Sequence, residues 1–475
     1  MTETVHVDIA VVGGGSGGLS VAAGAAQMGA SVLLFEKGRM GGDCLNYGCV
    51  PSKATIAAAH AASAFRKAGR FGIAPEAPRV DAAALRRHVQ GVIADIAPHD
   101  SVERFEGLGV RVVEAPARFV GRRLLEGGGV RAKARWTVLA TGSTPVVPPI
   151  PGLNELPFLT NETVFDLEET PAHLLVLGGG PVGIELAQAH RRLGAEVTVV
   201  QRGPILPRDD ADAAALIRAR LVAEGVRLCE HAAVTEASGR PGNIVLHFEA
   251  DGRRETAHGT HLLVAAGRRP DLAGLDLDTG GIAWTPDGVT VDARLRSSDR
   301  RVLAVGDVAG GLRFTHVAGY HAGIAIRNAL FRIPAKADTT AAPWVTYTDP
   351  ELAHVGMTGA EAKAAFGNRA RVLRQEFAEN DRARAERDTE GFIKAVVGPR
   401  GRVLGATIVG PHAGELIQPW VLSVSQKLRI GALAGMIAPY PTLGEVSKRA
   451  AGSYYTDALF GPRTRRLVRF LMRFA

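Results

Sequence analysis

Two cysteines, Cys44 and Cys49, carry the clearest chemistry in this sequence. They lie in the run "GGDCLNYGCVPSK" (residues 41–53) with four residues between them. At this spacing two thiols can close a disulfide if the chain turns into the first turn of a helix, whose N–H groups also stabilise a thiolate. Pro51 suits such a helix start, and an alanine-rich stretch follows. The alternative is half a zinc site, which needs two more nearby ligands, whereas Cys229 is distant. We therefore predict a redox-active disulfide.

A nucleotide-binding motif precedes the cysteine pair. Residues 7–12, "VDIAVV", are typical of a buried parallel strand, and Gly13, Gly15 and Gly18 follow in G-x-G-x-x-G spacing. A helix and a second strand ending at Glu36 complete a βαβ unit. In such a unit the diphosphate of a dinucleotide sits at the helix N-terminus, and the acid accepts hydrogen bonds from the ribose hydroxyls. The strand, helix and acid at the expected distances make this assignment specific.

The same device recurs later in the chain. "HLLVLGGGPVGIELAQAHRRLGAEVTVVQR" carries Gly178, Gly180 and Gly183 in the same spacing. Duplication of a supersecondary unit is informative about the whole fold. It predicts that one polypeptide binds two dinucleotides.

The second nucleotide site differs from the first in its charge. Glu36 lies 23 positions after Gly13, and the same offset from Gly178 leads to Gln201, with Arg202 next and Arg208 nearby. An acid at this place repels a 2′-phosphate, whereas arginine binds one. The sequence therefore favours NADPH over NADH. The alternative is that both arginines are merely solvated.

Further segments complete the two nucleotide-binding units. "TVLATGSTP" predicts a strand and a glycine turn at Thr141 and Gly142 that pass close to a cofactor, and "RVLAVGDVAG" predicts a strand ending at Asp307, whose carboxylate can hold a polyhydroxyl chain. A helical stretch is expected from about Val80 to Leu108. From about Ala341 the pattern changes to strands, hairpins and helices without a nucleotide motif, which suits subunit contacts.

Composition restricts the class of protein. The 475 residues contain only three cysteines, which argues against a disulfide-stabilised secreted scaffold and favours the cytoplasm. The N-terminus lacks the basic residues of a signal peptide, and the uncharged run 11–35 divides into strand, turn and helix rather than a membrane span. The net charge is +8, of which the last thirteen residues supply five arginines, leaving 8 − 5 = +3. No nucleic-acid-binding module is visible, and we predict no nucleic-acid partner.

Together these motifs resemble the class I pyridine nucleotide-disulfide oxidoreductases, which include glutathione reductase, dihydrolipoamide dehydrogenase and mercuric reductase. The resemblance covers nearly the whole chain. It implies an α/β fold with two Rossmann-like dinucleotide-binding domains and a C-terminal α+β dimerisation domain. It also implies a homodimer whose active sites are completed across the interface. The implied boundaries are 1–146 with 276–340 for the FAD-binding domain, 147–275 for the NAD(P)-binding domain, 341–462 for the dimerisation domain and 463–475 for a basic amphipathic tail.

The resemblance assigns a role to each site residue. Electrons would pass from NADPH to FAD and then to the disulfide at Cys49, which releases Cys44 as the thiol that meets the substrate. Lys53 would lie near the reactive flavin nitrogen with Glu185 as its ion-pair partner, because a cation there stabilises negative charge on the reduced flavin. Asp307 matches the residue that binds the ribityl chain of FAD, and Glu36 the residue on its adenosine ribose.

One position departs from the disulfide reductases, which have a histidine directly before Pro-Thr in the C-terminal motif. Here the stretch reads "APYPTLGE", with Tyr440 in place of the histidine and Glu445 in place of the acid that orients it. A phenol with a pKa of about 10 is a poor base at neutral pH. Mercuric reductases also carry tyrosine here, although they usually end in a cysteine pair that this chain lacks. Tyr440 either ligates or borders a site for a soft metal ion or small oxidant, or only fills space at the interface.

We therefore predict an NADPH-dependent FAD/disulfide oxidoreductase of the mercuric reductase-like branch. Its acceptor would be a soft electrophile such as mercuric ion, a quinone or a small disulfide. The alternatives are a dihydrolipoamide dehydrogenase-type enzyme, against which Tyr440 and Gln201 argue, and a redox-sensing flavoprotein without a dedicated substrate. In the tail, Leu467, Phe470, Leu471 and Phe474 recur at helical spacing among arginines. Such a helix lies on an anionic membrane surface or docks on its own dimer.

Overall fold

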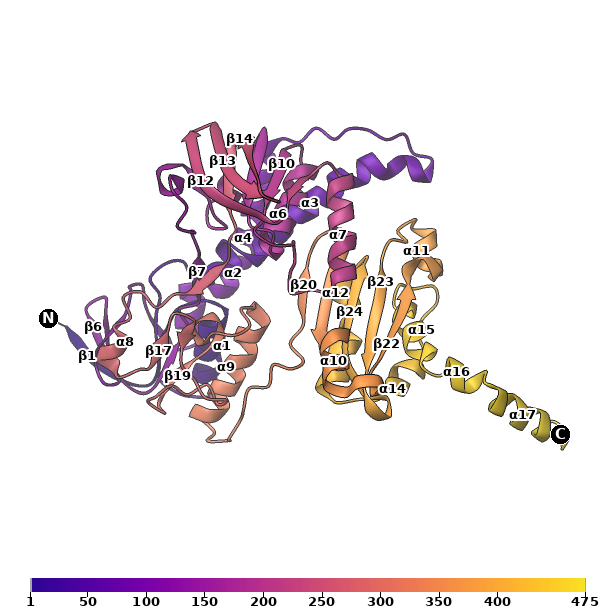
Figure 1. Cartoon of the computed structure of the whole chain (residues 1–475). Helices are drawn as coiled ribbons and strands as arrows, with labels where there is room; N and C mark the ends of the chain where they lie inside the picture. Colours follow the sequence, from indigo (N-terminus) through magenta and orange to yellow (C-terminus); the bar gives the residue numbers. More distant parts are fainter. Residues whose placement is uncertain (1, 475) are drawn as a thin grey trace. The chain divides into compact units, whose positions relative to one another are not determined.

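The computed structural model describes residues 2–474, which are traced in Figure 1. These residues divide into two compact units. Unit 1 holds the described residues up to Lys67, with Pro75–Pro204 and Gly225–Thr339. Unit 2 holds Ala68–Ala74, Ile205–Glu224 and the described residues from Thr340 onward.

The first sheet of unit 1 is organised around the strand that precedes the first glycine loop. Its order is β3-β2-β1-β6-β5-β4, and β19 pairs with β6. The strands are β1 (Glu3–Val12), β2 (Val32–Phe35), β3 (Val110–Val113), β4 (Arg118–Gly121), β5 (Leu124–Gly127), β6 (Val130–Leu139) and β19 (Val302–Ala304). β1 runs parallel to both β2 and β6. The predicted strand at 7–12 is confirmed. The apolar run 9–12 is explained because both of its faces are buried: Ile9 and Val11 pack into one core, Ala10 and Val12 into the other.

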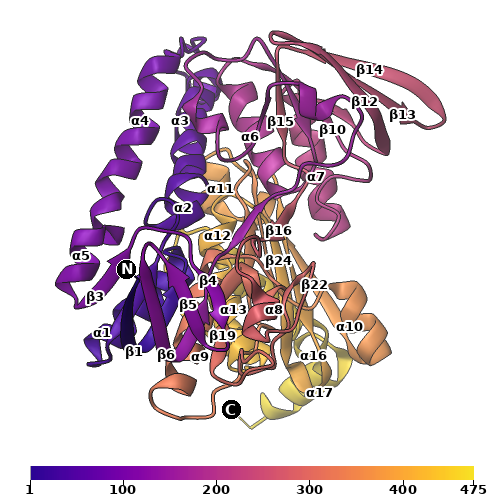
Figure 2. The same ribbon diagram turned by 90° about the vertical axis from the view of Figure 1, so that its left-hand side faces the viewer.

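The helices of unit 1 pack on this sheet, on the sheet of the second glycine motif or on one another. They are α1 (Ser16–Gln27), α2 (Gly42–Asn46), α3 (Cys49–Lys67), α4 (Ala82–Ile96), α5 (Val102–Gly107), α6 (Pro181–Arg192), α8 (Leu277–Gly280) and α9 (Thr315–Ala329). Figure 2 shows α3 and α4 side by side. The helical stretch expected from about Val80 to Leu108 is interrupted between α4 and α5. Pro98 lacks an amide hydrogen, and Ser101 starts α5 afresh by accepting a hydrogen bond from the Arg104 amide at 3.2 Å.

The second glycine motif has its own parallel sheet in unit 1, in the order β11-β10-β9-β15-β8. Its strands are β8 (Phe158–Leu159), β9 (His173–Leu177), β10 (Glu196–Val200), β11 (Arg227–Cys229) and β15 (His261–Val264). An antiparallel sheet follows, made of β12 (Ala232–Arg240), β13 (Asn243–Ala250) and β14 (Arg253–Gly259). Short pairs complete the unit: β7 (Ser143–Pro145) with β16 (Arg268–Pro270), and β17 (Trp284–Thr285) with β18 (Gly288–Val289). The predicted duplication is thus present in the fold.

Unit 2 is built on an antiparallel sheet in the order β20-β21-β24-β23-β22. The strands are β20 (Trp344–Thr346), β21 (Glu351–Gly356), β22 (Arg371–Glu376), β23 (Phe392–Val397) and β24 (Val403–Gly410). Its helices are α7 (Ala211–Ala223), α10 (Gly359–Phe366), α11 (Asp381–Ala385), α12 (Ala413–Leu416), α13 (Gln418–Ser425), α14 (Ile430–Ala434), α15 (Glu445–Ser453), α16 (Thr456–Leu459) and α17 (Pro462–Leu471). The fully buried Trp420 lies in the core between helices and sheet. The expected α+β segment is confirmed.

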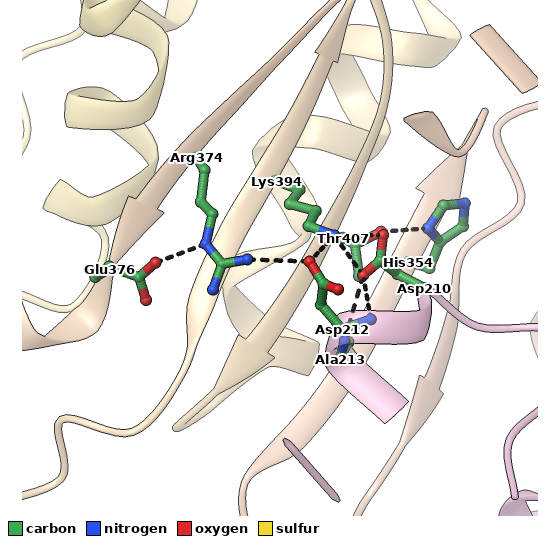
Figure 3. A network of polar contacts seen from close by, with 8 residues as sticks. All are labelled: Asp210, Asp212, Ala213, His354, Arg374, Glu376, Lys394 and Thr407. Atoms are coloured by element: carbon green, nitrogen blue, oxygen red, sulfur yellow. Dashed lines mark hydrogen bonds and ion pairs between the residues drawn. The ribbon is translucent and has the colours of Figure 1, made fainter. Parts of the chain in front are cut away.

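Charged side chains join α7 to the sheet of unit 2, although α7 follows the second nucleotide motif in the sequence. Lys394 of β23 lies 2.7 Å from the Asp210 carboxylate and 2.7 Å from Asp212 (Figure 3). Asp210 also caps α7 by accepting hydrogen bonds from the amides of Asp212 and Ala213. Arg374 of β22 adds a contact to Asp212 at 3.1 Å. The start of α7 is therefore fixed to unit 2.

No helix among residues 2–474 combines the length and the apolar character that crossing a bilayer requires.

The first testable prediction concerns this attachment. Replacing Lys394 by methionine leaves the Asp210 carboxylate without its cation and leaves Asp212 with Arg374 alone. We expect a loss of about 2 kcal/mol in the free energy of unfolding of unit 2. Amide hydrogen exchange of α7 should accelerate by the factor that corresponds to this loss of free energy. Lys363→Met on the exposed face of α10 is the matched control. Equal stability of the two variants would contradict the assignment.

Candidate active site

The two glycine loops have the same close backbone contacts. A Cβ atom on Gly18 would lie 1.9 Å from the Gly13 carbonyl oxygen, and one on Gly183 would lie 2.0 Å from that of Gly178. No side chain fits such a gap, so the third glycine of each motif lets its helix pack against the preceding loop. The sequence spacing therefore reports the same physical constraint in both copies.

The N-termini of α1 and α6 are left open for an anion. Their N-cap residues are Gly15 and Gly180, and neither helix has a side-chain cap. Uncapped amide groups at a helix start, beside a loop without side chains, fit the diphosphate of a dinucleotide. The residues present thus fit the two dinucleotides that the sequence predicts.

Glu36 and Gln201 hold their glycine loops in the same way. The Glu36 carboxylate accepts a hydrogen bond from the Gly14 amide and one from the Gly38 amide at 2.6 Å. The Gln201 side-chain oxygen accepts one from the Gly179 amide at 2.8 Å. The neutral amide therefore reproduces the contact of the carboxylate without its charge.

Arg202 and Arg208 are both exposed. Arg202 belongs to unit 1 and Arg208 to unit 2. Among residues 2–474, no carboxylate pairs with either guanidinium. Both are therefore available to an anion.

The segment with the cysteines packs directly on the first glycine loop. The Gly41 amide donates to the Gly14 carbonyl at 2.9 Å, and a Cβ atom on Gly42 would lie 2.7 Å from the Gly15 Cα. Cys44 lies in α2, and Cys49 is the first residue of α3. The predicted helix start therefore applies to Cys49, while Cys44 occupies a separate short helix. Both are free thiols in this structure.

The surroundings of the two thiols give them opposite acidities. A hydrogen bond from Cys44, aided by Thr315 and the charge of Lys53, lowers the pKa of Cys49 to about 6, although burial opposes it. Thr315 Oγ1 lies 3.4 Å from Cys49 Sγ. The same Cys44–Cys49 hydrogen bond, together with burial, raises the pKa of Cys44. At neutral pH the reduced pair is a Cys49 thiolate that accepts a hydrogen bond from a Cys44 thiol.

Lys53 and Glu185, paired in the sequence analysis, lie together in unit 1. Lys53 Nζ is 2.7 Å from Glu185 Oε2, and the Glu185 side chain is only 6% exposed. Lys53 lies one turn after Cys49 on α3, and Glu185 lies on α6. The ion pair therefore connects the cysteine helix to the helix that follows the second glycine loop.

A chain of polar contacts, which the sequence did not predict, links Asp307 to the segment that carries Cys44. The Asp307 carboxylate accepts a hydrogen bond from Ser143 at 2.6 Å, and Arg268 donates to the same hydroxyl at 2.8 Å. Arg268 also lies 3.1 Å from Asp43, the neighbour of Cys44. Burial raises the pKa of Asp307. No spacing rule joins these residues, because they come from four separate segments.

Thr141 and Gly142 form a turn that pairs with the segment around Asp271, which also belongs to unit 1. The Thr141 hydroxyl donates to the Asp271 carbonyl at 2.6 Å, and the Asp271 amide donates to the Gly142 carbonyl at 3.0 Å. The following β7 pairs antiparallel with β16. The Thr141 side chain thus shapes the turn.

Tyr440 of unit 2 is 69% exposed and has a partner that the sequence did not indicate. Its hydroxyl donates to Asp381 at 3.2 Å, and this hydrogen bond raises the pKa of the phenol. Glu445, expected as the orienting acid, instead faces the Thr442 amide at 3.5 Å. Asp381 lies 59 residues before Tyr440, so no local motif could have identified it.

Comparisons with known proteins agree with this geometry. The family described as "Pyridine nucleotide-disulphide oxidoreductase" matches residues 7–322, and its dimerisation domain matches residues 342–451. A mercuric reductase of Streptomyces lividans is 33% identical over 459 residues, which are 95% of this chain and 96% of the relative. A dihydrolipoyl dehydrogenase of Geobacillus stearothermophilus is 34% identical over 456 residues, 94% of this chain and 96% of the relative.

Among solved structures, the chain is similar to the Cu(II) complex of the HOCl-induced flavoprotein disulfide reductase RclA from Escherichia coli. The TM-score is 0.82 at 27% identity, and the match covers 93% of this chain and 99% of RclA. The predicted fold class is thus confirmed over nearly the whole chain.

The acidity of Cys49 can be tested through the hydrogen bond that causes it. Cys44→Ala removes the donor, and we expect the pKa of Cys49 to rise well above 6 because the thiolate loses its strongest contact. Cys44→Ser keeps a donor and should keep the low value. The measurement is the pH dependence of Cys49 alkylation in reduced protein carrying Cys229→Ser. Identical profiles for both variants would show that Cys44 does not set this acidity.

Proposed function

Since the chain belongs to the pyridine nucleotide-disulphide oxidoreductase family, we propose that it passes two electrons from NADPH, through FAD and the Cys44–Cys49 pair, to a soft electrophilic acceptor. The observation that carries the proposal is the stabilised Cys49 thiolate at the start of α3. A thiolate held by a neighbouring thiol and a nearby cation is the reduced form expected of a redox-active disulfide.

The first glycine loop, Glu36 and Asp307 are the residues proposed to hold FAD. FAD, when bound, supplies a two-electron carrier between the nicotinamide and the disulfide. Glu36 already fixes the loop through the Gly14 amide. Asp307, half-buried and bonded to Ser143, lies just after a strand end, where it can accept a hydrogen bond from a hydroxyl of the ribityl chain.

Lys53 is proposed to stabilise negative charge beside the cysteines. Its ammonium is held at 2.7 Å by the buried Glu185 carboxylate, and its charge contributes to the low pKa of Cys49. A preorganised cation acts without reorganisation when negative charge develops. Glu185 is thus a positioning residue, because it acts through Lys53.

The two cysteines divide the thiol chemistry between them. Reduction of their disulfide takes up two electrons and yields the Cys49 thiolate and, with one proton, the Cys44 thiol. Cys44 is the proposed interchange thiol: it loses its proton when it meets the acceptor, and the two sulfurs together pass two electrons to the acceptor as the disulfide re-forms. The high pKa of Cys44 keeps its proton in place until an acceptor binds.

NADPH is the proposed electron donor because the second nucleotide site lacks the acid of the first. Gln201 makes the loop contact of Glu36 with a neutral amide, so no carboxylate repels a 2′-phosphate. Arg202 follows directly and is exposed, and Arg208 is the second proposed phosphate ligand. Arginine binds phosphate through charge-assisted hydrogen bonds.

The proposed acceptor is a soft metal ion, a quinone or a small disulfide. Tyr440 stays protonated at neutral pH because a phenol has a pKa of about 10, and its hydrogen bond to Asp381 raises that pKa further. It therefore cannot supply the base that disulfide reduction normally uses. This favours a metal ion or a quinone over a small disulfide, whose reduction depends on that base. Relatives named mercuric reductase and the Cu(II) complex of RclA are in line with a metal ion. A dihydrolipoamide dehydrogenase-type enzyme is the second candidate.

A homodimer is proposed, because a dimerisation domain of this family matches residues 342–451. In that arrangement Tyr440 and Glu445 of one subunit would complete the cysteine site of the other. The Asp381 contact then orients the phenol, while Glu445 supports the adjoining loop.

An acceptor panel tests this function. NADPH oxidation by the flavin-loaded enzyme is followed with mercuric ion, Cu(II), a quinone, glutathione disulfide and lipoamide. We expect turnover with a metal ion or quinone, and loss of it in Cys44→Ser. Tyr440→His should raise the disulfide rates, up to the ~10²–10⁴ typical of a general acid–base residue. Turnover of no acceptor above background oxygen reduction would favour a redox sensor instead.

Coenzyme choice has its own test. Gln201→Glu keeps the hydrogen bond to Gly179 but restores a negative charge, so we expect the kcat/KM for NADPH to fall at least ~10-fold relative to that for NADH. Arg202→Ala should lower only the NADPH value. Gln201→Ala removes the contact with the Gly179 amide without adding charge. It therefore distinguishes repulsion of the 2′-phosphate from distortion of the glycine loop. An unchanged ratio in all three variants would rule out NADPH selection at this site.

The C-terminal tail is proposed to bind an anionic membrane surface. α17 and the following turn lie beyond the dimerisation match that ends at residue 451. On helical spacing Arg465, Arg466, Arg469 and Arg473 share one side, and Leu467, Phe470, Leu471 and Phe474 share the other. The apolar members are more than half exposed, and Figure 1 shows α17 leading away from the sheet of unit 2. Exposed apolar side chains beside unpaired positive charge suit anionic lipid.

Liposome sedimentation tests this contact. The full chain should bind vesicles containing anionic lipid, whereas a chain truncated after residue 462 should not, and salt should weaken binding. Arg465→Gln with Arg469→Gln should have an intermediate effect. Equal binding of full and truncated chains would exclude the membrane role, and a changed oligomeric state after truncation would indicate docking on the dimer.

A further inference from the structure

A cleft in unit 1 has an unusual concentration of positive charge. It measures about 600 Å³ and is lined by six arginines, namely Arg135, Arg294, Arg296, Arg300, Arg301 and Arg332. Asp8 is the one acid among its lining residues in the part of the chain that the structure describes. Over the whole sequence basic residues exceed acidic ones only by 56 to 48. The cleft is therefore far more basic than the chain as a whole.

The strand register separates this cleft from the first nucleotide loop. The loop follows Val12, which pairs with Leu139 at the carboxyl end of β6. Trp136 of the cleft pairs with Ile9, three residues earlier on both strands, a distance of about 10 Å. Arg301 directly precedes β19, at the amino end of that strand. The cleft thus opens toward the opposite edge of the sheet and is distinct from the dinucleotide site.

Only some of the arginines are neutralised. Arg135 lies 3.3 Å from Asp8, and Arg296 forms a two-pronged contact with Asp292. No carboxylate among residues 2–474 pairs with the guanidinium of Arg294, Arg300 or Arg332. Three unpaired positive charges in one concave surface repel one another, and a bound polyanion relieves that repulsion.

The remaining wall of the cleft is held in place. The Asn328 amide donates to the carbonyls of Arg294 and Ala335, and its oxygen accepts from the Ala335 amide. This clamp fixes the segment that carries Arg332. The Arg301 guanidinium lies over the Trp136 ring at 5.8 Å from its centroid. The charges therefore belong to ordered segments.

We propose that this cleft binds an oligophosphate, either free or as the phosphate chain of a nucleoside triphosphate. Several linked phosphates match guanidinium groups spread along a cleft, and arginine pairs with phosphate oxygens through paired hydrogen bonds. A single phosphate engages too few of these groups for comparable affinity. Trp136, stacked beneath Arg301, reports occupancy through its fluorescence.

Isothermal titration calorimetry tests the proposal on flavin-loaded enzyme, with NADP⁺ in excess to fill the nicotinamide site. The probes are tripolyphosphate, ATP and inorganic phosphate. We expect tripolyphosphate to bind at least ~10-fold tighter than phosphate. If ATP binds as tightly as tripolyphosphate, the chain of phosphates is what the cleft recognises. If ATP binds more tightly, the nucleoside contributes as well.

Variants locate the binding. The triple change Arg294→Ala, Arg300→Ala and Arg332→Ala should weaken tripolyphosphate by ~100-fold or more, since each charge-assisted contact is worth roughly tenfold. Trp136→Phe should abolish the fluorescence change. The matched control removes three exposed arginines of the β12–β14 sheet, Arg240, Arg253 and Arg254. Absent binding, or equal weakening in the control, would overturn the proposal.

Discussion

The contact on which the site depends is between two backbones, where the cysteine segment lies against the first glycine loop. The Gly41 amide donates to the Gly14 carbonyl, and Gly42 approaches Gly15 too closely for a side chain at position 42. Because these contacts involve main-chain atoms, they fix α2 relative to the loop independently of side-chain rotamers. The start of α3 follows within a few residues, so the thiols keep a set position beside the first glycine loop. Every acidity and ion pair at the cysteines rests on this arrangement.

The repeated glycine motif made the fold predictable from the sequence. Each G-x-G-x-x-G motif stands between a strand and a helix, and the third glycine of each is required by a carbonyl at about 2 Å from any Cβ. The Lys53–Glu185 pair could be anticipated only through the family resemblance, since 132 residues separate the two side chains. The ends of helices were harder to predict: the helical stretch expected from about Val80 divides into two helices where Pro98 and Ser101 intervene.

What the sequence could not provide is long-range polar contact. Asp43, Arg268 and Ser143 meet through the pairing of two short strands, β7 and β16, that no periodicity foretells. Asp381, the first residue of α11, reaches Tyr440 across 59 residues of sequence. Likewise the attachment of α7 to the sheet of unit 2 arises from Lys394, far along the chain. Such contacts depend on how segments assemble, whereas motifs report only what one segment does.

Glu36 and Gln201 occupy equivalent positions in the two glycine motifs, and comparing them separates the structural role of this side chain from its charge. Each side chain receives a loop amide with the same type of oxygen, so the turn needs an acceptor there and is indifferent to ionisation. An amide and a carboxylate are nearly isosteric, and exchanging them alters the local potential while the hydrogen bond persists. Duplicated sites built this way can diverge in the ligands they admit without any cost to folding. One ancestral βαβ design can thereby serve two different dinucleotides in one polypeptide.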